Sequence, residues 1–418
     1  MIEETKKYLI QPSRLVGSVC VSGAKNSALR LLAASLLTNE KIKIDNFPGS
    51  ILDAQIHVEM LKQLGKECTV TGDNILITEP GKLMSRLDWQ GRSIRNTLLI
   101  LGALVARTGQ GAVPLPGGCD IGQRKYDLHE MILRKMGAEV WTEQNMLCAE
   151  VKNRLMGSDI YLPIRSTGAT ENAIICGSLA HGITRIWNPH IQPEILDLID
   201  FLKSMGSKIT VYGLEHIEIQ GMDILSGTKH KTISDNIEAF TWMIGSLITD
   251  GDVEIKEFPF DALEVSLIHL RASGVRFYKN DRDLIVRGGR CYPIEISTGS
   301  YPSIKSDIQP LFAVCALLAK GKSVIVDLRY PKRFSYAEEF KKMGADVNIS
   351  EGILIINGGM PLKGSTVMAS DLRSGIALAM AGIVADGETV IEDAWQIDRG
   401  YDRFVEKMNT LGAKISSL

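Results

Sequence analysis

A six-fold repeat runs along the whole chain and constrains its fold more than any other feature. Each repeat contains a helix with a polar start, a strand, a second helix, and then a glycine that precedes another strand. The glycines that end the repeats are 72, 69, 68, 70 and 68 residues apart. They are Gly65, Gly137, Gly206, Gly274, Gly344 and Gly412. A period this regular indicates an architecture built from copies of one supersecondary unit.

Within a repeat, the spacing of the apolar residues changes from the helical period to the strand period. Residues 27–37 have the helical pattern, and residues 41–45 alternate as in a strand. Alternating helices and strands indicate an α/β fold. Because 418 residues, 45% of them hydrophobic, exceed what one core usually holds, we expect two domains of three repeats each.

The helix starts predict anion binding. Unpaired N–H groups and a partial positive charge at the beginning of a helix favour anions. Polar or charged residues recur at this place in the repeats: Lys25-Asn26, Arg95-Asn96, Glu171-Asn172, Asp235-Asn236, Asp307 and Asp371. If the fold gathers these starts, they form a site for a small anion.

Composition narrows the classes of partner. The net charge is −2, and no basic stripe indicates a nucleic-acid or membrane surface, so we expect small-molecule substrates and allow for self-association. The N-terminus is charged and no uncharged run is long enough to span a membrane, which predicts a cytoplasmic protein.

The 7 cysteines are scattered without a CxxC pair, and the 7 histidines lack metal-ligand spacing. We therefore expect neither a disulfide framework nor a metal site.

The second repeat contains an unusual segment, 109–124, which has five glycines and two prolines. Such composition predicts an irregular insertion, and we interpret it as a mobile lid. Cys119 lies in this segment, five residues before Arg124. A nearby cation lowers the pKa of a thiol, so Cys119 could be a proton donor, a nucleophile or a redox sensor, or it could be inert.

Several arginines and one aspartate are further candidates. Arg95, Arg124, Arg373 and Arg399 lie at repeat starts, in the lid or in a polar turn. A guanidinium group matches carboxylate and phosphate oxygens, although each arginine could also be an ordinary surface residue. Asp307 could cap a helix, or it could act as a base toward a substrate hydroxyl.

At these residues the sequence resembles the UDP-N-acetylglucosamine enolpyruvyl transferases, in order and along essentially the whole chain. The matching segments are 22–28, 115–122, 127–129, 168–172, 371–373 and 397–401. The resemblance implies two domains, each of three βαβαββ units arranged as an inside-out α/β barrel, with the active site in the cleft between them. The first domain would span residues 23–229 and carry the Cys119 lid, and the second would combine 1–22 with 230–418.

The resemblance also implies a reaction. The enolpyruvyl (carboxyvinyl) group of phosphoenolpyruvate moves to the 3-hydroxyl of UDP-N-acetylglucosamine, and phosphate leaves by addition and elimination, in peptidoglycan precursor synthesis. No metal or organic cofactor is implied. Lys25, Arg124 and Arg399 would hold the phosphate and carboxylate of phosphoenolpyruvate. Arg95, Arg333 and Arg373 would have supporting roles.

The remaining roles concern proton transfer and the acceptor. Cys119 matches a lid cysteine that acts as general acid and is alkylated by fosfomycin, and Asp307 matches the base. Asn26 matches a contact to the acceptor sugar. The nucleotide would be bound by two segments, one with Asp127 and Leu128 at the uracil and one with Ser166 and Gly168 near the diphosphate.

The chain departs from the family pattern on the acceptor side. Lys125-Tyr126 stands where Pro-Val is usual, Ile164 where a lysine is usual, Asn236 where an arginine is usual, and Lys305-Ser306 where Pro-Thr is usual. These changes, together with Arg165, keep open a relative that uses another acceptor, such as UMP in nucleoside-antibiotic biosynthesis. Two further alternatives are a noncatalytic paralogue and an RNA 3′-phosphate cyclase, which shares the βαβαββ unit but uses ATP and a histidine.

Overall fold

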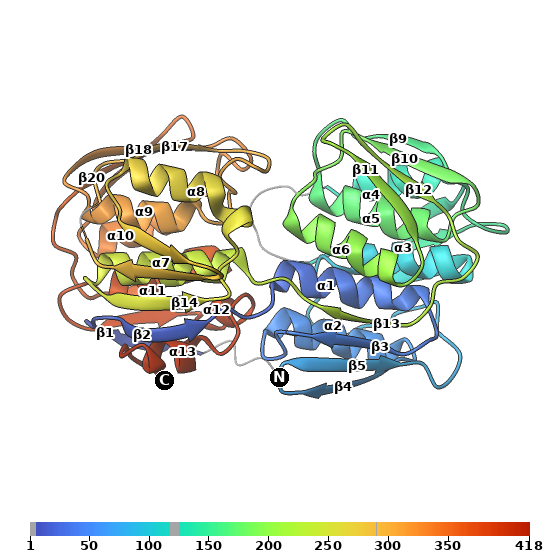
Figure 1. The fold of residues 1–418 in the computed structure, drawn as a ribbon, viewed down its shortest axis with the longest axis horizontal. Helices are drawn as coiled ribbons and strands as arrows, with labels where there is room; N and C mark the ends of the chain where they lie inside the picture. Colours follow the sequence, from blue (N-terminus) through green and yellow to red (C-terminus); the bar gives the residue numbers. More distant parts are fainter. Residues whose placement is uncertain (1–5, 118–124, 290) are drawn as a thin grey trace. The chain divides into compact units, whose positions relative to one another are not determined.

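The computed structural model of the chain describes residues 6–117, 125–289 and 291–418. Cys119, Arg124 and the other residues of 118–124, the last part of the expected lid, lie outside these residues. The chain divides into two compact units. Among the described residues, the first unit comprises 23–117 and 125–233, and the second unit comprises the part up to Ser22 and Ser234–Leu418. Helices alternate with strands along both units, which confirms the α/β class (Figure 1).

The first unit contains three small sheets. Their strand orders are β13(Thr228–Lys231)-β3(Ile42–Asp45)-β5(Asn74–Thr78)-β4(Glu67–Thr71), β6(Gln110–Pro114)-β8(Met146–Glu150)-β7(Glu139–Glu143), and β11(Lys208–Tyr212)-β12(His216–Gln220)-β10(Ile183–Trp187)-β9(Asp159–Tyr161). β13 pairs with β3 and β9 with β10 in parallel, and the other strand pairs are antiparallel. In the three-stranded sheet, a parallel bridge from Arg86 to Ala112 takes the place of a fourth strand.

The second unit also contains three sheets, each of four strands. Their orders are β15(Phe277–Asn280)-β16(Asp283–Arg287)-β14(Asp252–Lys256)-β2(Val16–Cys20), β17(Glu295–Thr298)-β18(Gly321–Asp327)-β20(Ile353–Gly358)-β19(Asp346–Ser350), and β21(Thr366–Met368)-β22(Thr389–Glu392)-β1(Tyr8–Gln11)-β23(Lys414–Ser417). The first strand of the chain, β1, therefore lies between strands from its C-terminal end.

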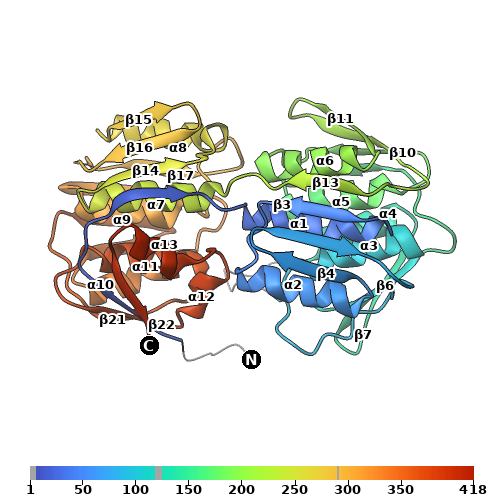
Figure 2. The same ribbon diagram turned by 60° about the horizontal axis from the view of Figure 1, so that its bottom comes forward.

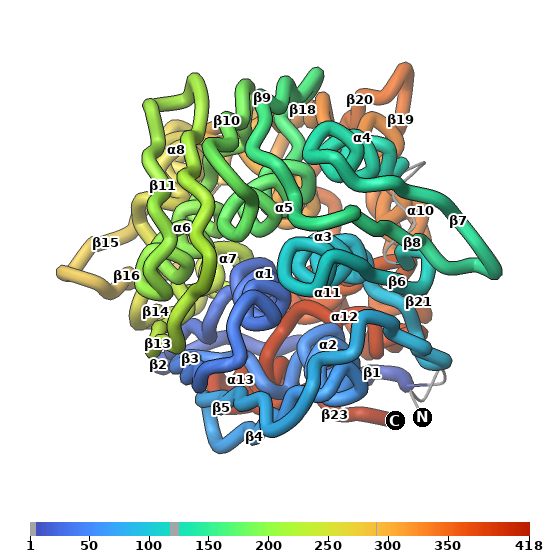
Figure 3. Tube along the Cα trace, turned by 90° about the vertical axis from the view of Figure 1, so that its right-hand side faces the viewer, coloured from blue at the N-terminus to red at the C-terminus, as the bar shows by residue number. Residues whose placement is uncertain are grey.

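Three helices form the centre of each unit. They are α1(Lys25–Ala34), α3(Thr97–Thr108) and α5(Thr167–Ser178) in the first unit, and α7(Asn236–Ile248), α9(Gln309–Leu318) and α11(Leu372–Gly382) in the second. α3 contacts α1 and α5, and α9 contacts α7 and α11. These helices are buried on almost every side, as expected for α3, α7 and α9, which are apolar nearly all round. In Figure 3, the strands of the first unit lie around its central helices.

The second helix of each repeat packs nearer the surface of its unit (Figure 2). These helices are α2(Leu52–Gln63), α4(Asp127–Lys135), α6(Pro193–Ser204), α8(Phe260–Ala272), α10(Tyr336–Lys342) and α13(Phe404–Thr410), and the short α12(Trp395–Asp398) precedes the last of them. No helix in the described part of the chain is long and apolar enough to cross a membrane.

The repeated glycines are the residues that end these second helices. The φ angles of the six glycines are 100°, 95°, 99°, 83°, 86° and 87° in chain order. These values lie in the left-handed region, which glycine adopts without a steric penalty and which commonly ends a helix. The regular spacing of these glycines therefore marks where the second helix of each repeat ends, just before the hairpin that completes the repeat.

Two local predictions are wrong. The segment expected to be an irregular lid begins with a regular strand, β6, which pairs antiparallel with β8. Gly111 of this strand packs on α3, where a Cβ would lie 2.9 Å from Leu101 Cδ1. Glu171 is not at a helix start, since α5 begins at Thr167 with Ser166 as its N-cap.

Candidate functional site

In the second unit, Asp307 lies between two arginines. Its Oδ1 is 2.6 Å from Arg333 Nη1, and its Oδ2 is 3.3 Å from Arg373 Nη2. The two arginine side chains are only 5% and 4% exposed, whereas that of Asp307 is 31% exposed. The structure thus brings together three of the predicted site residues, in a cluster that we call the Asp307–arginine cluster.

Neighbouring side chains hold this cluster in place. Ser306 Oγ accepts a hydrogen bond of 3.2 Å from Arg333 Nη1 and donates one of 2.5 Å to Asp327 Oδ2. Asp327 ends β18, and its other oxygen accepts a hydrogen bond of 2.7 Å from Thr298 Oγ1. Gln309 Nε2 donates to the backbone oxygen of Arg333 at 3.0 Å. Arg333 is therefore fixed at both its backbone and its guanidinium group.

The arginines change the acidity of Asp307. Burial alone would raise the pKa of its carboxyl, but Arg373 and then Arg333 outweigh this effect and hold the pKa well below its ordinary value. Without a ligand, Asp307 is therefore ionised and stabilised, which makes it a weak base.

The starts of all three central helices of the second unit meet at this cluster. Asp307 precedes α9, Arg373 is in the first turn of α11, and the charge of Arg373 interacts with that of Asp235, the N-cap of α7. Two of these starts carry their own carboxylate caps. Asp235 accepts hydrogen bonds from the N–H groups of Ile237 and Glu238, and Asp371 likewise caps α11. At these two starts, N–H groups that could bind an anion already donate to carboxylates, and the charge of Arg373 lies close to both.

Arg399 belongs to the same unit and ends α12. Its residue exposure is 4%, its Nη1 donates to Gln396 Oε1 at 2.9 Å, and its guanidinium group lies 6.0 Å from the centre of the Trp395 ring. A buried guanidinium group held by an amide and an aromatic ring is fixed in direction, as a binding residue requires.

In the first unit, Lys25 is the first residue of α1 and is paired with a buried carboxylate. Its Nζ is 2.6 Å from Asp53 Oδ2 in α2, and the two side chains are 8% and 6% exposed. This contact fixes the direction of the ammonium group. Asn26, the next residue, is partly exposed.

The starts of α4 and α5 are packed against each other. Asp127 and Leu128 open α4, and Ser166 caps α5 by accepting a hydrogen bond of 3.4 Å from the N–H of Ala169. A Cβ on Gly168 would lie 3.1 Å from His129 Nε2. The structure therefore brings together the two segments that the resemblance assigns to the nucleotide.

The remaining candidate residues of the first unit are Arg95, which the resemblance assigns to phosphoenolpyruvate, and two acceptor-side residues, Ile164 and Arg165. Arg95 lies just before α3 and donates through Nη2 to the backbone oxygen of Lys125 at 2.8 Å. Ile164 is 52% exposed, and Arg165 Nε donates to Asn188 Oδ1 at 3.3 Å.

Sequence reasoning missed the residues that position the site. Asp53 has the pattern of an ordinary acidic residue in the first turn of a helix, and Asp327 that of a polar residue at a strand end. Each partner is far away in the sequence, so only the fold shows the pairs. Asp327 ends its strand as Asp45 ends the corresponding strand of the first repeat, and this shared position was a signal for Asp327.

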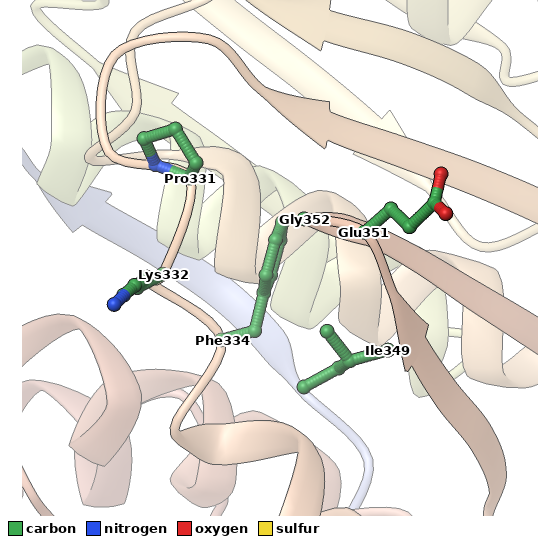
Figure 4. Close-up of a pocket in the computed structure, with 6 residues that line it drawn as sticks. All are labelled: Pro331, Lys332, Phe334, Ile349, Glu351 and Gly352. Carbon is green, nitrogen blue, oxygen red and sulfur yellow. The ribbon is translucent and has the colours of Figure 1, made fainter.

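A surface pocket elsewhere in the second unit has no such chemistry. Its lining residues are Pro331, Lys332, Phe334, Ile349, Glu351 and Gly352, shown in Figure 4. None of the predicted site residues lines it. Among the described residues, no group of three or more His, Cys, Asp or Glu side chains could hold a metal ion.

The chain resembles known proteins over almost its whole length. A model of the EPSP synthase (3-phosphoshikimate 1-carboxyvinyltransferase) family matches residues 9–408. The chain is 38% identical to UDP-N-acetylglucosamine 1-carboxyvinyltransferase 1 of Carboxydothermus hydrogenoformans, over 98% of this chain and 97% of that protein. It is 36% identical to the protein of the same name from Caldanaerobacter subterraneus subsp. tengcongensis, over 98% of this chain and 99% of that protein.

Solved structures support the same fold. The enolpyruvyl transferase NikO from Streptomyces tendae has a TM-score of 0.90 and 23% identity, with 99% of each chain covered. An EPSP synthase from Acinetobacter baumannii has a TM-score of 0.77 and 20% identity, with 99% of this chain and 100% of that chain covered. Taken with the family match and the sequence relatives, these likenesses show that the chain belongs to the EPSP synthase family and is a carboxyvinyltransferase.

Proposed function

We propose that this protein transfers the enolpyruvyl group of phosphoenolpyruvate to the 3-hydroxyl of UDP-N-acetylglucosamine and releases phosphate. Relatives that are 35–38% identical over nearly their full length are named UDP-N-acetylglucosamine 1-carboxyvinyltransferases. The observation that carries the proposal is the Asp307–arginine cluster, which places a carboxylate beside two buried cations. A reaction between a hydroxyl group and a small, highly charged anion needs a carboxylate to take the hydroxyl proton and cations to bind the anion.

The residues divide the reaction as follows. Asp307 takes the proton of the acceptor hydroxyl, and the oxygen of that hydroxyl bonds to C2 of phosphoenolpyruvate. Cys119 gives a proton to the methylene carbon. The resulting tetrahedral ketal then loses a proton from that carbon and expels phosphate, which restores the double bond. Lys25, Arg124 and Arg399 stabilise the phosphate and carboxylate charges, with Arg95, Arg333 and Arg373 in support.

The Asp307–arginine cluster lets an anionic substrate change the basicity of Asp307. Without a ligand, Arg333 and Arg373 are paired with Asp307 and depress its pKa. When an anionic substrate pairs with these guanidinium groups, their hold on Asp307 weakens and its pKa rises toward the ordinary range. The carboxylate then becomes a better base for the acceptor hydroxyl.

The proposal includes the inside-out arrangement of the repeats that the resemblance implies. Its support is that the three central helices of each unit are buried on almost every side, and that the strands of the first unit lie around its central helices (Figure 3).

A second acceptor, such as UMP, is favoured by one observation. Ile164, which takes the place of a usual lysine, is 52% exposed beside the turn with Ser166 and Gly168. An exposed apolar side chain there supplies no charge for a sugar diphosphate. Lys125, Arg165 and Asn236 are the other positions at which the two acceptors would be distinguished.

Phosphate release separates these possibilities. The purified protein is given phosphoenolpyruvate with UDP-N-acetylglucosamine and, separately, with UMP, and the product is identified by its mass. Release with the nucleotide sugar supports the leading proposal, and release with UMP alone supports the second. If phosphoenolpyruvate binds but no acceptor yields phosphate, a noncatalytic role replaces both. The variant Ile164→Lys should improve use of the nucleotide sugar only in the second case.

A further inference from the structure

Two residues at the first strand of the second unit hold the short helix that leads into Arg399. This helix, α12, comprises only Trp395–Asp398, and Arg399 is its C-cap. Tyr8 begins β1, and Lys6 lies just before that strand. Tyr8 Oη donates a hydrogen bond to Asp398 Oδ1, and Lys6 Nζ lies 2.7 Å from Asp398 Oδ2. Each oxygen of this carboxylate therefore accepts a hydrogen bond from the N-terminal segment.

The same segment also holds the beginning of α12. The N–H of Ala394, the N-cap of α12, donates to the backbone oxygen of Lys6 at 2.8 Å. The strand β1 is itself fixed, because it pairs with β22 on one side and with β23 on the other. A helix of about one turn is not stable by itself in water. Contacts with other elements, those from β1 among them, therefore determine the direction in which α12 presents Arg399.

The hydrogen bond from Tyr8 is the more buried of the two side-chain contacts. Tyr8 is only 1% exposed, whereas the side chain of Lys6 is 30% exposed. Burial and then the charge of Asp398 raise the pKa of Tyr8 above its ordinary value, so its hydroxyl stays protonated and donates. Hydrogen bonds to a charged acceptor are stronger than those between neutral groups, and partly exposed ion pairs are weaker. We therefore expect Tyr8 to contribute more than Lys6.

We propose that Tyr8 and Lys6 are positioning residues for anion binding, which act through Asp398 to direct the guanidinium group of Arg399. The inference rests on the proposed function, in which Arg399 binds phosphoenolpyruvate. The guanidinium group of Arg399 is held by two side chains of α12, so it moves together with that helix. Because a displacement of about 1 Å in a site can cost about 100-fold in rate, a small shift of α12 would weaken the contact with the anion.

Tyr8→Phe tests this role, because it removes the hydroxyl group and keeps the buried ring. We expect the Kd for phosphoenolpyruvate, measured by calorimetric titration, to rise about fivefold. Lys6→Met should raise it by a smaller factor, since that ion pair is partly exposed. Lys7→Met is the matched control, because Lys7 Nζ lies 2.7 Å from Glu392 Oε1 in β22 rather than from a residue of α12. The control should bind phosphoenolpyruvate as the wild type does.

A double variant distinguishes positioning from a general loss of structure. Arg399→Ala should weaken the binding of phosphoenolpyruvate by itself. Adding Tyr8→Phe to that variant should weaken binding no further, because no guanidinium group remains to be directed. A general effect on the second unit would instead weaken binding by the same factor with and without Arg399. Urea denaturation establishes that each variant is folded, and if Tyr8→Phe does not fold, Lys6→Met takes its place in the same comparison.

The inference is overturned if Tyr8→Phe binds phosphoenolpyruvate as tightly as the wild type, or if its effect is the same in the absence of Arg399. Normal binding by Arg399→Ala would overturn it too, since there would be nothing to position. Failure of the proposed function gives a different result. A wild-type protein that binds phosphoenolpyruvate but releases no phosphate with any acceptor would contradict the transferase activity alone, because the titrations measure binding without turnover.

Discussion

Replacement of Asp307 by asparagine tests the charge balance of the Asp307–arginine cluster. The asparagine keeps the size of the side chain but removes the negative charge between Arg333 and Arg373, whose side chains are only 5% and 4% exposed. Removing one partner of a buried ion pair costs about 3–5 kcal/mol, and an exposed pair is worth about 0–1 kcal/mol. Because the Asp307 side chain is 31% exposed, we expect a loss of about 2 kcal/mol in the free energy of unfolding.

The variant should also bind anions more tightly, because Asp307 no longer competes for the two guanidinium groups. If about 1.4 kcal/mol of the lost interaction becomes available to a ligand, the affinity for inorganic phosphate or phosphoenolpyruvate rises about tenfold. Turnover should nevertheless fail, since an amide cannot accept the hydroxyl proton. Urea denaturation and calorimetric titration with phosphate measure the two effects. Unchanged stability together with unchanged phosphate affinity would refute the reasoning.

The pH dependence of stability tests the same charge balance independently. The pKa of Asp307 is depressed in the folded protein relative to its ordinary value of 3.8. Its ionised form therefore contributes stability above about pH 4, and this contribution is lost as the pH falls through the folded pKa. The difference in stability between the wild type and Asp307→Asn should be full at neutral pH and shrink below about pH 4. Asp386→Asn is the matched control, because Asp386 is exposed and makes no ion pair within the described part of the chain.

Three further predictions concern other parts of the site. Cys119→Asp should retain some transfer activity but escape inactivation by fosfomycin, because a carboxylic acid donates a proton without being a thiol nucleophile; undiminished inactivation would assign the alkylation elsewhere. Asp53→Asn should lower the free energy of unfolding by about 3 kcal/mol in urea, because Lys25 loses a buried carboxylate partner; an unchanged midpoint would contradict this. Gly168→Ala should raise KM for the nucleotide acceptor more than KM for phosphoenolpyruvate, since the new methyl group would lie 3.1 Å from His129 Nε2; equal changes would count against a nucleotide site there.

The repeat endings were predictable because their cause is local. A left-handed residue after a helix strongly favours glycine, so the six glycines mark the same structural position wherever they occur. The alternation of helices and strands follows from apolar spacing in the same way. The strand β6 was not predictable from composition, since it forms by pairing with β8, a segment distant in the sequence, and its glycine packs against α3.

The charged pairs of the site could not be derived from the sequence for a related reason. Arg373 follows Asp307 by 66 positions and Asp53 follows Lys25 by 28, so nothing in the spacing says which charges meet. The sequence indicates residue types suited to an anion, whereas the pairing depends on how the central helices pack. The resemblance named Arg333 and Arg373 as supporting residues without implying that they would be paired with the base.

Helix starts and arginines contribute differently to the anion site predicted from the repeats. At α7 and α11, Asp235 and Asp371 already accept the N–H groups that a free helix start would offer to an anion. In the proposed reaction, guanidinium groups therefore bind the anion there, and two of them, those of Arg333 and Arg373, depress the pKa of Asp307. In the proposed reaction, the cations that receive the anionic substrate are thus the ones that restrain the base. Occupancy of the anion site and activation of Asp307 become one event, which keeps the base weak while phosphoenolpyruvate is absent.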